Sequence, residues 1–285
     1  MHIGLGLPVD DPDVLLDWAR RADAGPFRTL ALLDRLVWHN PEPLVTLGVL
    51  AGATTRIRLQ TEVLLAPLRS TALLGAQAAT LDRLSGGRFT LGLGLGGRAD
   101  DLAAAGIPAR GLGARLDGQI DRLRAQFGGP VGDEGPAGAR IGPEPATPGG
   151  PEILFGAFHE KALARIARAG DGLICAAAPS WAGGLIGTLR RQWAEAGREG
   201  RPRIVGQLNV ALGADAPAAR ESLGAYYAFT GTPERMVAGL VTEAPALRSG
   251  IRAFEDLGAD EVVLYCWSTD PDQVERLAET VGGAH

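Results

Sequence analysis

The chain has 285 residues, 46% of them hydrophobic, and a formal net charge of -5 at pH 7. This length can bury a large core, as one large domain or two small ones. The apolar runs are shorter than the ~20 residues that a membrane-spanning helix needs, and the N-terminus lacks the pattern of a secretion signal. The acidic balance argues against a nucleic-acid partner, so we expect a cytoplasmic protein that binds a small molecule.

The two cysteines, Cys175 and Cys266, are far apart in the sequence, and each lies in an apolar run. Neither belongs to a C-x-x-C pair or to a Cys/His ligand spacing, so the sequence predicts no disulfide and no metal site. The apolar flanks of Cys175 favour a small buried hydrophobic residue over a nucleophile.

Short apolar strands alternate with helical patterns through the first half of the chain. The strands are predicted at Ile3 to Leu7, Thr29 to Leu33, Ile57 to Leu65 and Phe89 to Leu95. The helices are predicted at Pro12 to Ala24, Pro43 to Thr54, Thr71 to Leu84 and Leu112 to Phe127.

Residues 128 to 150 interrupt this alternation with a segment dense in Gly and Pro, which predicts a flexible loop. Beyond it, strands are predicted at Ile153 to Phe155, Gly172 to Ala177, Ile204 to Leu212 and Glu261 to Trp267. Helices are predicted at Lys161 to Ala169, Ala182 to Ala196, Pro233 to Leu257 with an interruption at Pro245, and Pro271 to Val281. Because the alternation resumes, we interpret the loop as an insertion before the fifth strand of a single domain, residues 1 to 285.

Eight strand-helix units in a chain of this length predict an α/β fold of the (β/α)8 TIM-barrel type. The uniformly hydrophobic strands fit parallel strands that are covered on both sides. An open doubly wound sheet is the alternative, because Gly92, Gly94 and Gly97 have the spacing G-x-G-x-x-G. That fingerprint also needs an acidic residue ~20 positions later at a strand end, whereas Asp117 lies in a helical pattern.

The carboxyl ends of the predicted strands are rich in glycine and apolar residues. In a barrel, the chemistry gathers at these ends. The segment Leu81 to Gly97 leads from a helix through a turn into the fourth strand, which ends in closely spaced glycines. Backbone can approach a ligand there without side chains in the way. Such a site suits a flat organic cofactor whose own atoms carry the chemistry.

Five segments carry a family resemblance. They are the second strand with its end at Asp34 and Arg35, and the segments EPLVTLGVLAGATTRIRL, TEVLLAP, LDRLSGGRFTLGLGLGG and FGAFHEKALARIARAGDGLI. Together they resemble the bacterial luciferase-like monooxygenase family, which includes flavin-dependent monooxygenases and deazaflavin-dependent oxidoreductases. The resemblance runs from the first predicted strand to the last and is looser after Ser180.

The resemblance implies a luciferase-like barrel that binds reduced FMN or, alternatively, an 8-hydroxy-5-deazaflavin coenzyme. With FMN from a separate flavin reductase, the enzyme would be a monooxygenase acting on a small organic substrate with oxygen. With the deazaflavin, it would transfer hydride without oxygen. A flavin-binding barrel without catalysis and a barrel enzyme for a phosphorylated metabolite are two further hypotheses.

The resemblance also implies two structural features. Members of the family often carry a non-proline cis peptide that supports the cofactor ring, which places Leu64, Leu65 and Ala66 among the expected cofactor-binding residues. Many form homodimers through helices near the second and third strands, where the apolar stretch Val45 to Gly52 lies.

Two segments are candidates for the cofactor phosphate. The first begins at Gly156, which precedes a helix whose N-terminus offers free backbone N–H groups to an anion. Its candidate residues are Gly156, Ala157, Phe158 and His159. The second combines glycines with a guanidinium that can form paired contacts with phosphate. Its candidate residues are Gly94, Gly96, Gly97 and Arg98.

The candidates for acid/base chemistry are Asp34, Arg35 and His39. Many relatives have a histidine at the end of the second strand, where this chain has Asp34 and Arg35. These two residues either take part in catalysis or form a structural ion pair with each other. His39 is either a substitute for the missing histidine or a solvated surface residue.

Aromatic and amide residues of the last two strands are candidates for the pocket walls. Tyr265 and Trp267 either line the substrate pocket or fill the core. Gln207 and Asn209 alternate on one side of the seventh strand, where they either bond to the cofactor ring or satisfy each other.

Overall fold

The computed structural model describes residues 1–128 and 140–282. Its strands form a closed, parallel barrel with the neighbour order β1, β2, β3, β5, β6, β7, β8, β9 and back to β1. Their bounds are β1 (His2–Gly6), β2 (Thr29–Leu32), β3 (Arg58–Thr61), β4 (Leu64–Leu65), β5 (Phe89–Gly94), β6 (Glu152–Gly156), β7 (Gly172–Cys175), β8 (Arg203–Val210) and β9 (Glu261–Cys266). With β3 and β4 counted as two parts of one strand, the predicted eight-stranded barrel is confirmed and the open sheet is excluded.

The third barrel strand is broken where the sequence predicts a continuous run. A cis peptide joins Glu62 to Val63, slightly before the expected position at residues 64 to 66. Gln60 pairs with Thr90, and Leu64 pairs with Leu93. The third strand therefore has one more residue than β5 between these two pairs, as in a β-bulge. The bulge separates β3 from β4 and places Glu62 and Val63 at the carboxyl end of the barrel.

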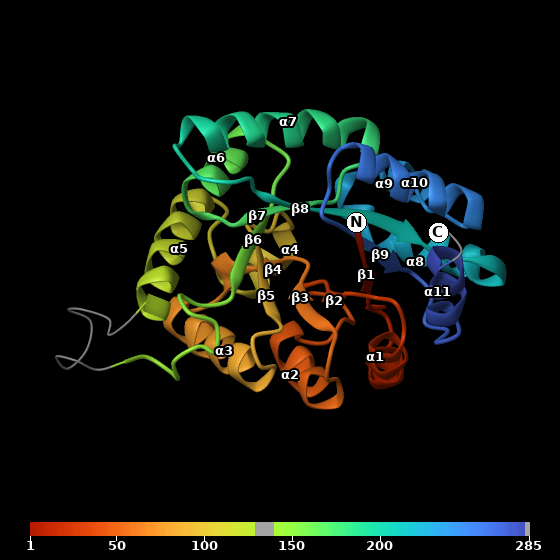
Figure 1. Ribbon diagram of the computed structural model, residues 1–285, viewed down its shortest axis with the longest axis horizontal. Helices are drawn as coiled ribbons and strands as arrows, with labels where there is room; N and C mark the ends of the chain where they lie inside the picture. The colour runs from red at the N-terminus through yellow and green to blue at the C-terminus, as the bar shows by residue number, and fades with distance from the viewer. Residues whose placement is uncertain (129–139, 283–285) are drawn as a thin grey trace.

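Helices surround the strands (Figure 1). The helices of the repeating units are α1 (Leu15–Ala24), α2 (Pro43–Ala53), α3 (Thr71–Leu84), α5 (Leu112–Gly128), α6 (Glu160–Ala169), α7 (Pro179–Glu195), α10 (Ala244–Asp256) and α11 (Gln273–Gly282). In α6 the buried residues are Leu163, Ile166 and Ala167, at the spacing of one helix face. Burial of such faces against the strands produces the outer layer of the barrel.

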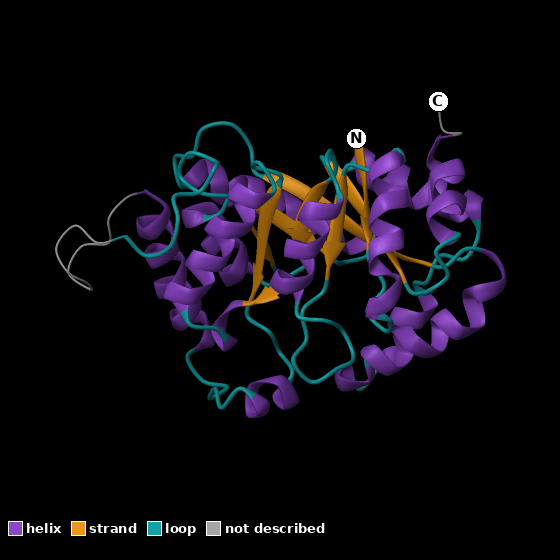
Figure 2. Cartoon of the chain, turned by 90° about the horizontal axis from the view of Figure 1, so that it is seen from below, coloured by secondary structure: helices purple, strands orange, loops and turns teal. Residues whose placement is uncertain are grey.

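Three further helices differ from the sequence expectation. α4 (Ala99–Ala104) and α8 (Ala216–Tyr226) follow strand ends and were not predicted. The helical stretch predicted from Pro233 to Leu257 is interrupted as expected, but the break precedes Pro245: it lies between α9 (Pro233–Ala238) and α10, and Pro245 lies in the first turn of α10. Between them Val241 forms a parallel bridge with Val210, which extends the end of β8. Figure 2 shows helices and loops gathered beyond one end of the strands.

The Gly/Pro-rich segment, predicted as a flexible loop over residues 128 to 150, falls partly outside the described residues, which resume at residue 140. The described part has no helix or strand and packs on the barrel helices. Thr147 donates a backbone hydrogen bond to Asp82 of α3 at 2.7 Å, and Gln126 of α5 donates to the carbonyl of Ile141 at 3.1 Å. Residues 140–150 are therefore anchored to α3 and α5.

Both cysteines are free and buried, as expected for small hydrophobic residues. Burial raises the pKa of the Cys266 thiol to about 12 and also raises the pKa of Cys175. Among the described residues, no cluster of His, Cys, Asp or Glu is arranged to hold a metal ion. No described helix has the length and apolar character needed to cross a bilayer.

Candidate functional site

A cavity of about 490 Å³ lies at the carboxyl ends of the barrel strands. Its wall combines Asp34 after β2, Glu62 and Val63 of the bulge, the chain that follows β5 and β6, and residues around the end of α8. This volume lies within the range of ~300–1,000 Å³ typical of small-molecule and cofactor sites.

The glycines at the end of β5 form one wall of the cavity, where the sequence predicts them. A Cβ at Gly94 would lie 2.5 Å from Val63 Cγ2, so a side chain there would displace Val63. Gly96 has a φ of 70°, the left-handed conformation that favours glycine. A Cβ at Gly97 would meet no atom within 4 Å, so its backbone borders open space. Leu65 also lines this wall, whereas Leu64 and Ala66 are buried behind it.

The segment after β6 forms the opposite wall. All four predicted residues, Gly156, Ala157, Phe158 and His159, line the cavity. His159 immediately precedes α6, and its side chain makes no capping hydrogen bond. The first backbone N–H groups of a helix have no partner within that helix, so α6 presents hydrogen-bond donors at this wall. Phe158 is exposed at the rim, where its ring stacks on Trp181 of α7 with centroids 5.6 Å apart.

Arg98 lines the cavity but is engaged by aromatic neighbours. Its guanidinium lies 4.3 Å from the ring centroid of Tyr226 and 3.7 Å from that of Phe229. Its Nη1 donates a hydrogen bond of 2.6 Å to the carbonyl of Tyr226. Burial lowers the pKa of this guanidinium. Arg98 thus lies beside the glycines, as predicted, and it also holds the end of α8 over the cavity.

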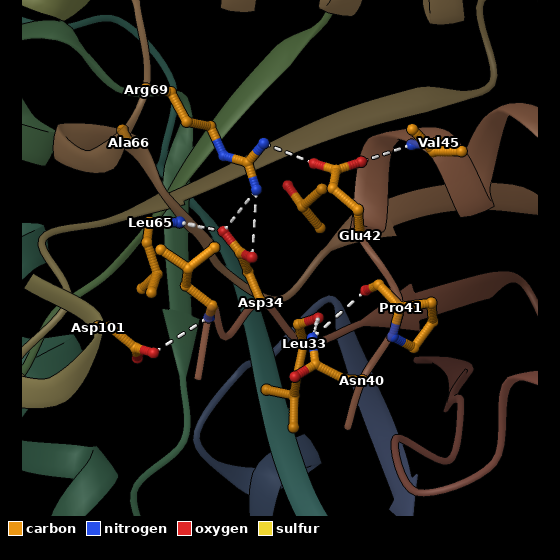
Figure 3. A network of polar contacts seen from close by, with 12 residues as sticks. Leu33, Asp34, Asn40, Pro41, Glu42, Val45, Leu65, Ala66, Arg69 and Asp101 are labelled. Atoms are coloured by element: carbon orange, nitrogen blue, oxygen red, sulfur yellow. Dashed lines mark hydrogen bonds and ion pairs between the residues drawn. The ribbon is translucent and has the colours of Figure 1, made fainter. Parts of the chain in front are cut away.

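Asp34 is the centre of a polar network at the end of β2 (Figure 3). Its carboxylate accepts a hydrogen bond of 2.8 Å from the backbone N–H of Leu65 and pairs with Arg69 at 3.0 Å. Arg69 also pairs with Glu42, whose other oxygen accepts a hydrogen bond from Val45 at the start of α2. Burial raises the pKa of Asp34, against the opposing effect of Arg69. The network ties β2 to β4 and α2.

Arg35 does not form the expected ion pair with Asp34 in the described structure, which corrects that hypothesis. Neighbouring residues at a strand end point in different directions, and Arg35 pairs instead with Asp100 at 2.6 Å and Asp101 at 3.4 Å, both in α4. Asp101 also accepts hydrogen bonds from the backbone N–H groups of Leu36 and Val37. Arg35 therefore anchors α4, and it is not among the described residues that line the cavity.

His39 is exposed, and its ring lies 5.4 Å from that of Trp38. It does not line the cavity in the described structure, so the structure agrees with the interpretation of this residue as a solvated surface group.

Tyr265 and Trp267 lie behind the cavity wall. Tyr265 is fully buried, and its hydroxyl accepts a hydrogen bond of 2.8 Å from the backbone N–H of Leu33. Trp267 donates to Asn209 Oδ1 at 2.8 Å, and Gln207 donates to the same oxygen at 3.5 Å. The structure therefore shows the aromatic pair filling the core and the amide pair joined by a mutual hydrogen bond.

Several residues of the site were missed by the sequence analysis. Among them are Glu62, Val63, Asp101, Tyr226, Tyr227 and Phe229, all of which line the cavity. Those around α8 had a readable signal, because Pro217 stands in its first turn and its buried residues Ala219, Leu223 and Tyr226 share one face. Glu62 had none, because it lies in a predicted strand whose interruption is not visible in the residue pattern.

An unpaired oxygen separates Glu62 from Asp34 and Asp101, the other buried carboxyl groups of the cavity wall. The residue is 3% exposed, and the Gln60 amide donates a hydrogen bond to its Oε2. Its Oε1 has no hydrogen-bond partner among the described residues. Burial raises the pKa of Glu62 to about 8. The cavity thus contains a carboxyl group that is mainly protonated at neutral pH.

Comparisons with known proteins assign the chain to a family and find relatives of similar sequence. The profile of the family described as luciferase-like monooxygenase matches residues 2–280. An uncharacterized protein of Mycobacterium tuberculosis (strain ATCC 25618 / H37Rv) is 33% identical over 212 residues, which cover 72% of this chain and 74% of the relative.

Solved structures share the fold at low identity. The monooxygenase RslO1 from Streptomyces bottropensis has a TM-score of 0.82 at 20% identity and 99% coverage of both chains. An F420-dependent secondary alcohol dehydrogenase, in complex with an F420-acetone adduct, has a TM-score of 0.84 at 17% identity and 100% coverage of both. A type II Baeyer-Villiger monooxygenase from the CAM plasmid of Pseudomonas putida, in complex with FMN, has a TM-score of 0.78 at 16% identity, covering 99% of this chain and 96% of its own. The profile match over nearly the whole chain shows that this protein belongs to the luciferase-like monooxygenase family.

Proposed function

We propose that this protein is a flavin-dependent monooxygenase that uses reduced FMN and oxygen on a small organic substrate. The observation that carries the proposal is the cavity at the carboxyl ends of the strands, with a glycine-lined wall and the N-terminus of α6 on opposite sides. Family membership and the fold shared with an FMN-bound monooxygenase support the choice of cofactor.

The residues of the cavity fit a flat cofactor that carries a phosphate. Gly94, Gly96 and Gly97 leave the backbone beside Val63 and Leu65 free of further side chains, which suits close approach of a ring. The backbone N–H groups at the start of α6 and the nearby Lys161 suit an anion. The unpaired buried Oε1 of Glu62 adds a polar atom that has no partner within the described protein.

The residues of this chain would provide binding, orientation and exclusion of water. Reduced FMN, when bound, supplies the electrons that activate oxygen. Val63, Leu65 and Phe155 make part of the wall apolar, which keeps water from the reacting atoms. The network of Asp34 and Arg69 holds β4 in place beneath that wall.

A deazaflavin-dependent hydride transfer is the second candidate. The observation that favours it is the full-length structural match to an F420-dependent alcohol dehydrogenase. The same cavity walls would hold the deazaflavin ring, and the reaction would not use oxygen. A separate flavin reductase is a proposed partner only for the FMN reaction.

Reconstitution of the purified protein tests both candidates. We expect FMN or 8-hydroxy-5-deazaflavin to bind with a Kd below about 100 μM, which corresponds to roughly 5 kcal/mol. Titration followed by the absorbance and fluorescence of the chromophore measures this. Oxygen consumption with reduced FMN, against hydride transfer with reduced deazaflavin, distinguishes the two reactions. Failure of both chromophores to bind would overturn the proposal, and tight binding without turnover would favour the non-catalytic flavin-binding barrel.

We further propose that two copies of the chain associate through α2 and α3. Both helices carry large apolar side chains in contact with solvent: Val45 and Val49 on α2, and Leu73 and Leu84 on α3, each more than half exposed. Apolar residues grouped on adjacent helices are typical of an interface between subunits.

A further inference from the structure

Glu62 differs from Asp34 and Asp101, the other buried acids of the cavity wall, in having an unpaired oxygen. It follows β3 directly, at the bulge, and it lines the cavity between the wall at Asp34 and the wall at Gly94. Its side chain is almost completely buried although it belongs to the cavity wall. A carboxyl group in this position is removed from bulk water yet lies where a bound molecule would contact the protein.

The hydrogen bonds around Glu62 are incomplete. The Gln60 amide N–H donates to Oε2, which leaves Oε1 as the oxygen that carries the proton in the neutral acid. Neither Glu62 Oε1 nor Gln60 Oε1 has a hydrogen-bond partner among the described residues. Buried polar atoms are normally paired, so an unpaired oxygen on a residue of the cavity wall points to a ligand that completes it.

The charged neighbours of Glu62 do not offset the cost of ionising this carboxyl group in a buried position. The nearby acid Glu261 of β9 opposes ionisation, and Arg203 of β8 favours it more weakly. Arg203 is already paired with both Glu261 and Glu152. The tyrosines that face Glu62, Tyr227 and Tyr265, are buried, and burial raises their pKa values, to about 12 for Tyr227, so they stay neutral. Burial, supported by the nearby Glu261, raises the pKa of Glu62 to about 8.

We propose that Glu62 is a cofactor-binding residue that donates a hydrogen bond from Oε1–H to a carbonyl oxygen or ring nitrogen of the bound flavin-type ring. This proposal rests on the proposed function, because it needs a heteroaromatic ring in the cavity. Gln60 holds Oε2 and thereby orients the donor. No bond other than hydrogen bonds changes, and the acid must keep its proton for the ring to bind.

The pH dependence of FMN binding tests this role. For the wild type we expect a constant Kd below pH 8 and a rise of about tenfold per pH unit above it, because the ionised carboxylate can no longer donate. Glu62→Gln keeps an N–H donor of similar shape and does not titrate. We therefore expect its Kd to stay within about threefold of the wild-type value at pH 7 and not to share the rise above pH 8. Fluorescence quenching of FMN measures both.

A matched control is Asp82→Asn. Asp82 is as fully buried, but it lies on α3 outside the cavity and both of its oxygens bind Thr147. This variant should retain the wild-type pH profile of FMN binding. If the Kd of Glu62→Gln for FMN also rises above pH 8, as in the wild type, the proposal is overturned.

Proton uptake on binding gives a second readout that needs no variant. At about pH 8.5, where most of the free Glu62 is ionised, FMN binding should take up more than about half a proton per molecule. Calorimetric titration in buffers of different ionisation enthalpy measures this number. Zero uptake would overturn the role of Glu62 even if Glu62→Gln failed to fold. Absence of FMN and deazaflavin binding to the wild type would overturn the proposed function as well, whereas binding without uptake would overturn the role of Glu62 alone.

Discussion

At the scale of single residues, two buried acids at the cavity have opposite surroundings. Asp34 pairs with Arg69 and accepts a backbone hydrogen bond from Leu65, so its oxygens are used by the protein. Glu62 has a single side-chain hydrogen bond, from Gln60, among the described residues. Burial raises the pKa of both acids. Asp34 is therefore a structural brace, and Glu62 is the acid with capacity left for a ligand.

The stability of Glu62→Gln should depend on pH. The pKa of Glu62 rises from 4.5 to about 8 on folding, so ionisation destabilises the folded state. The penalty is absent below pH 4.5, grows as pH rises, and is complete above pH 8. The free energy of unfolding of the glutamine variant, measured relative to that of the wild type, should therefore be about 3 kcal/mol higher at pH 7 than at low pH. Urea unfolding at pH 5 and pH 8 measures this, and a difference that does not change with pH would contradict it.

At the scale of elements, short helices beyond the strand ends complete the site. α4 supplies Asp101, which anchors the chain after β2, and the end of α8 supplies the rings that surround Arg98. The helices that face outward have a different role. α2 and α3 lie next to each other on the outside of the barrel (Figure 1), where their exposed apolar side chains form the proposed dimer surface.

Charge placed on α2 should separate the proposed dimer. The double variant Val45→Arg with Val49→Arg puts two cations on a surface that is apolar in the wild type, and burying them in an interface is costly. We expect a dimer for the wild type and a monomer for the variant in light scattering after gel filtration. Leu16→Arg on α1 is the control, since Leu16 is also an exposed apolar residue but lies on another helix. A wild type that is monomeric would contradict the proposal.

At the scale of the whole molecule, barrel closure depends on the contact between β3 and β5. Thr61 donates a hydrogen bond of 2.7 Å to the carbonyl of Gly92. A Cβ at Gly92 would lie 1.9 Å from the backbone oxygen of Thr61, so only glycine allows the strands to approach this closely. The glycines of β5 and the chain after it therefore have two roles: Gly92 closes the barrel, and Gly97 borders the cavity.

Two alanine substitutions should separate these roles. Gly92→Ala should lose about 2 kcal/mol of stability or more, because the strands must move apart. Gly97→Ala should change stability by less than about 0.5 kcal/mol, since its methyl group meets no protein atom. The same methyl group should weaken FMN binding by about tenfold, because it enters the space beside the glycines. Thermal unfolding and FMN titration measure the two effects. Equal loss of stability in both variants would contradict this division.

The sequence by itself determined the alternation of strands and helices, the barrel and two segments of the cavity wall. Hydrophobic periodicity and glycine spacing are local properties, and the barrel brings all carboxyl strand ends to one mouth, so Gly94 to Arg98 and Gly156 to His159 could be predicted to meet. Only the tertiary structure decided the partners of Asp34 and Arg35, the burial of Tyr265 and the exposure of His39. It also revealed the unpaired Oε1 of Glu62. These properties depend on contacts between residues far apart in the chain, and such contacts exist only once the barrel has closed.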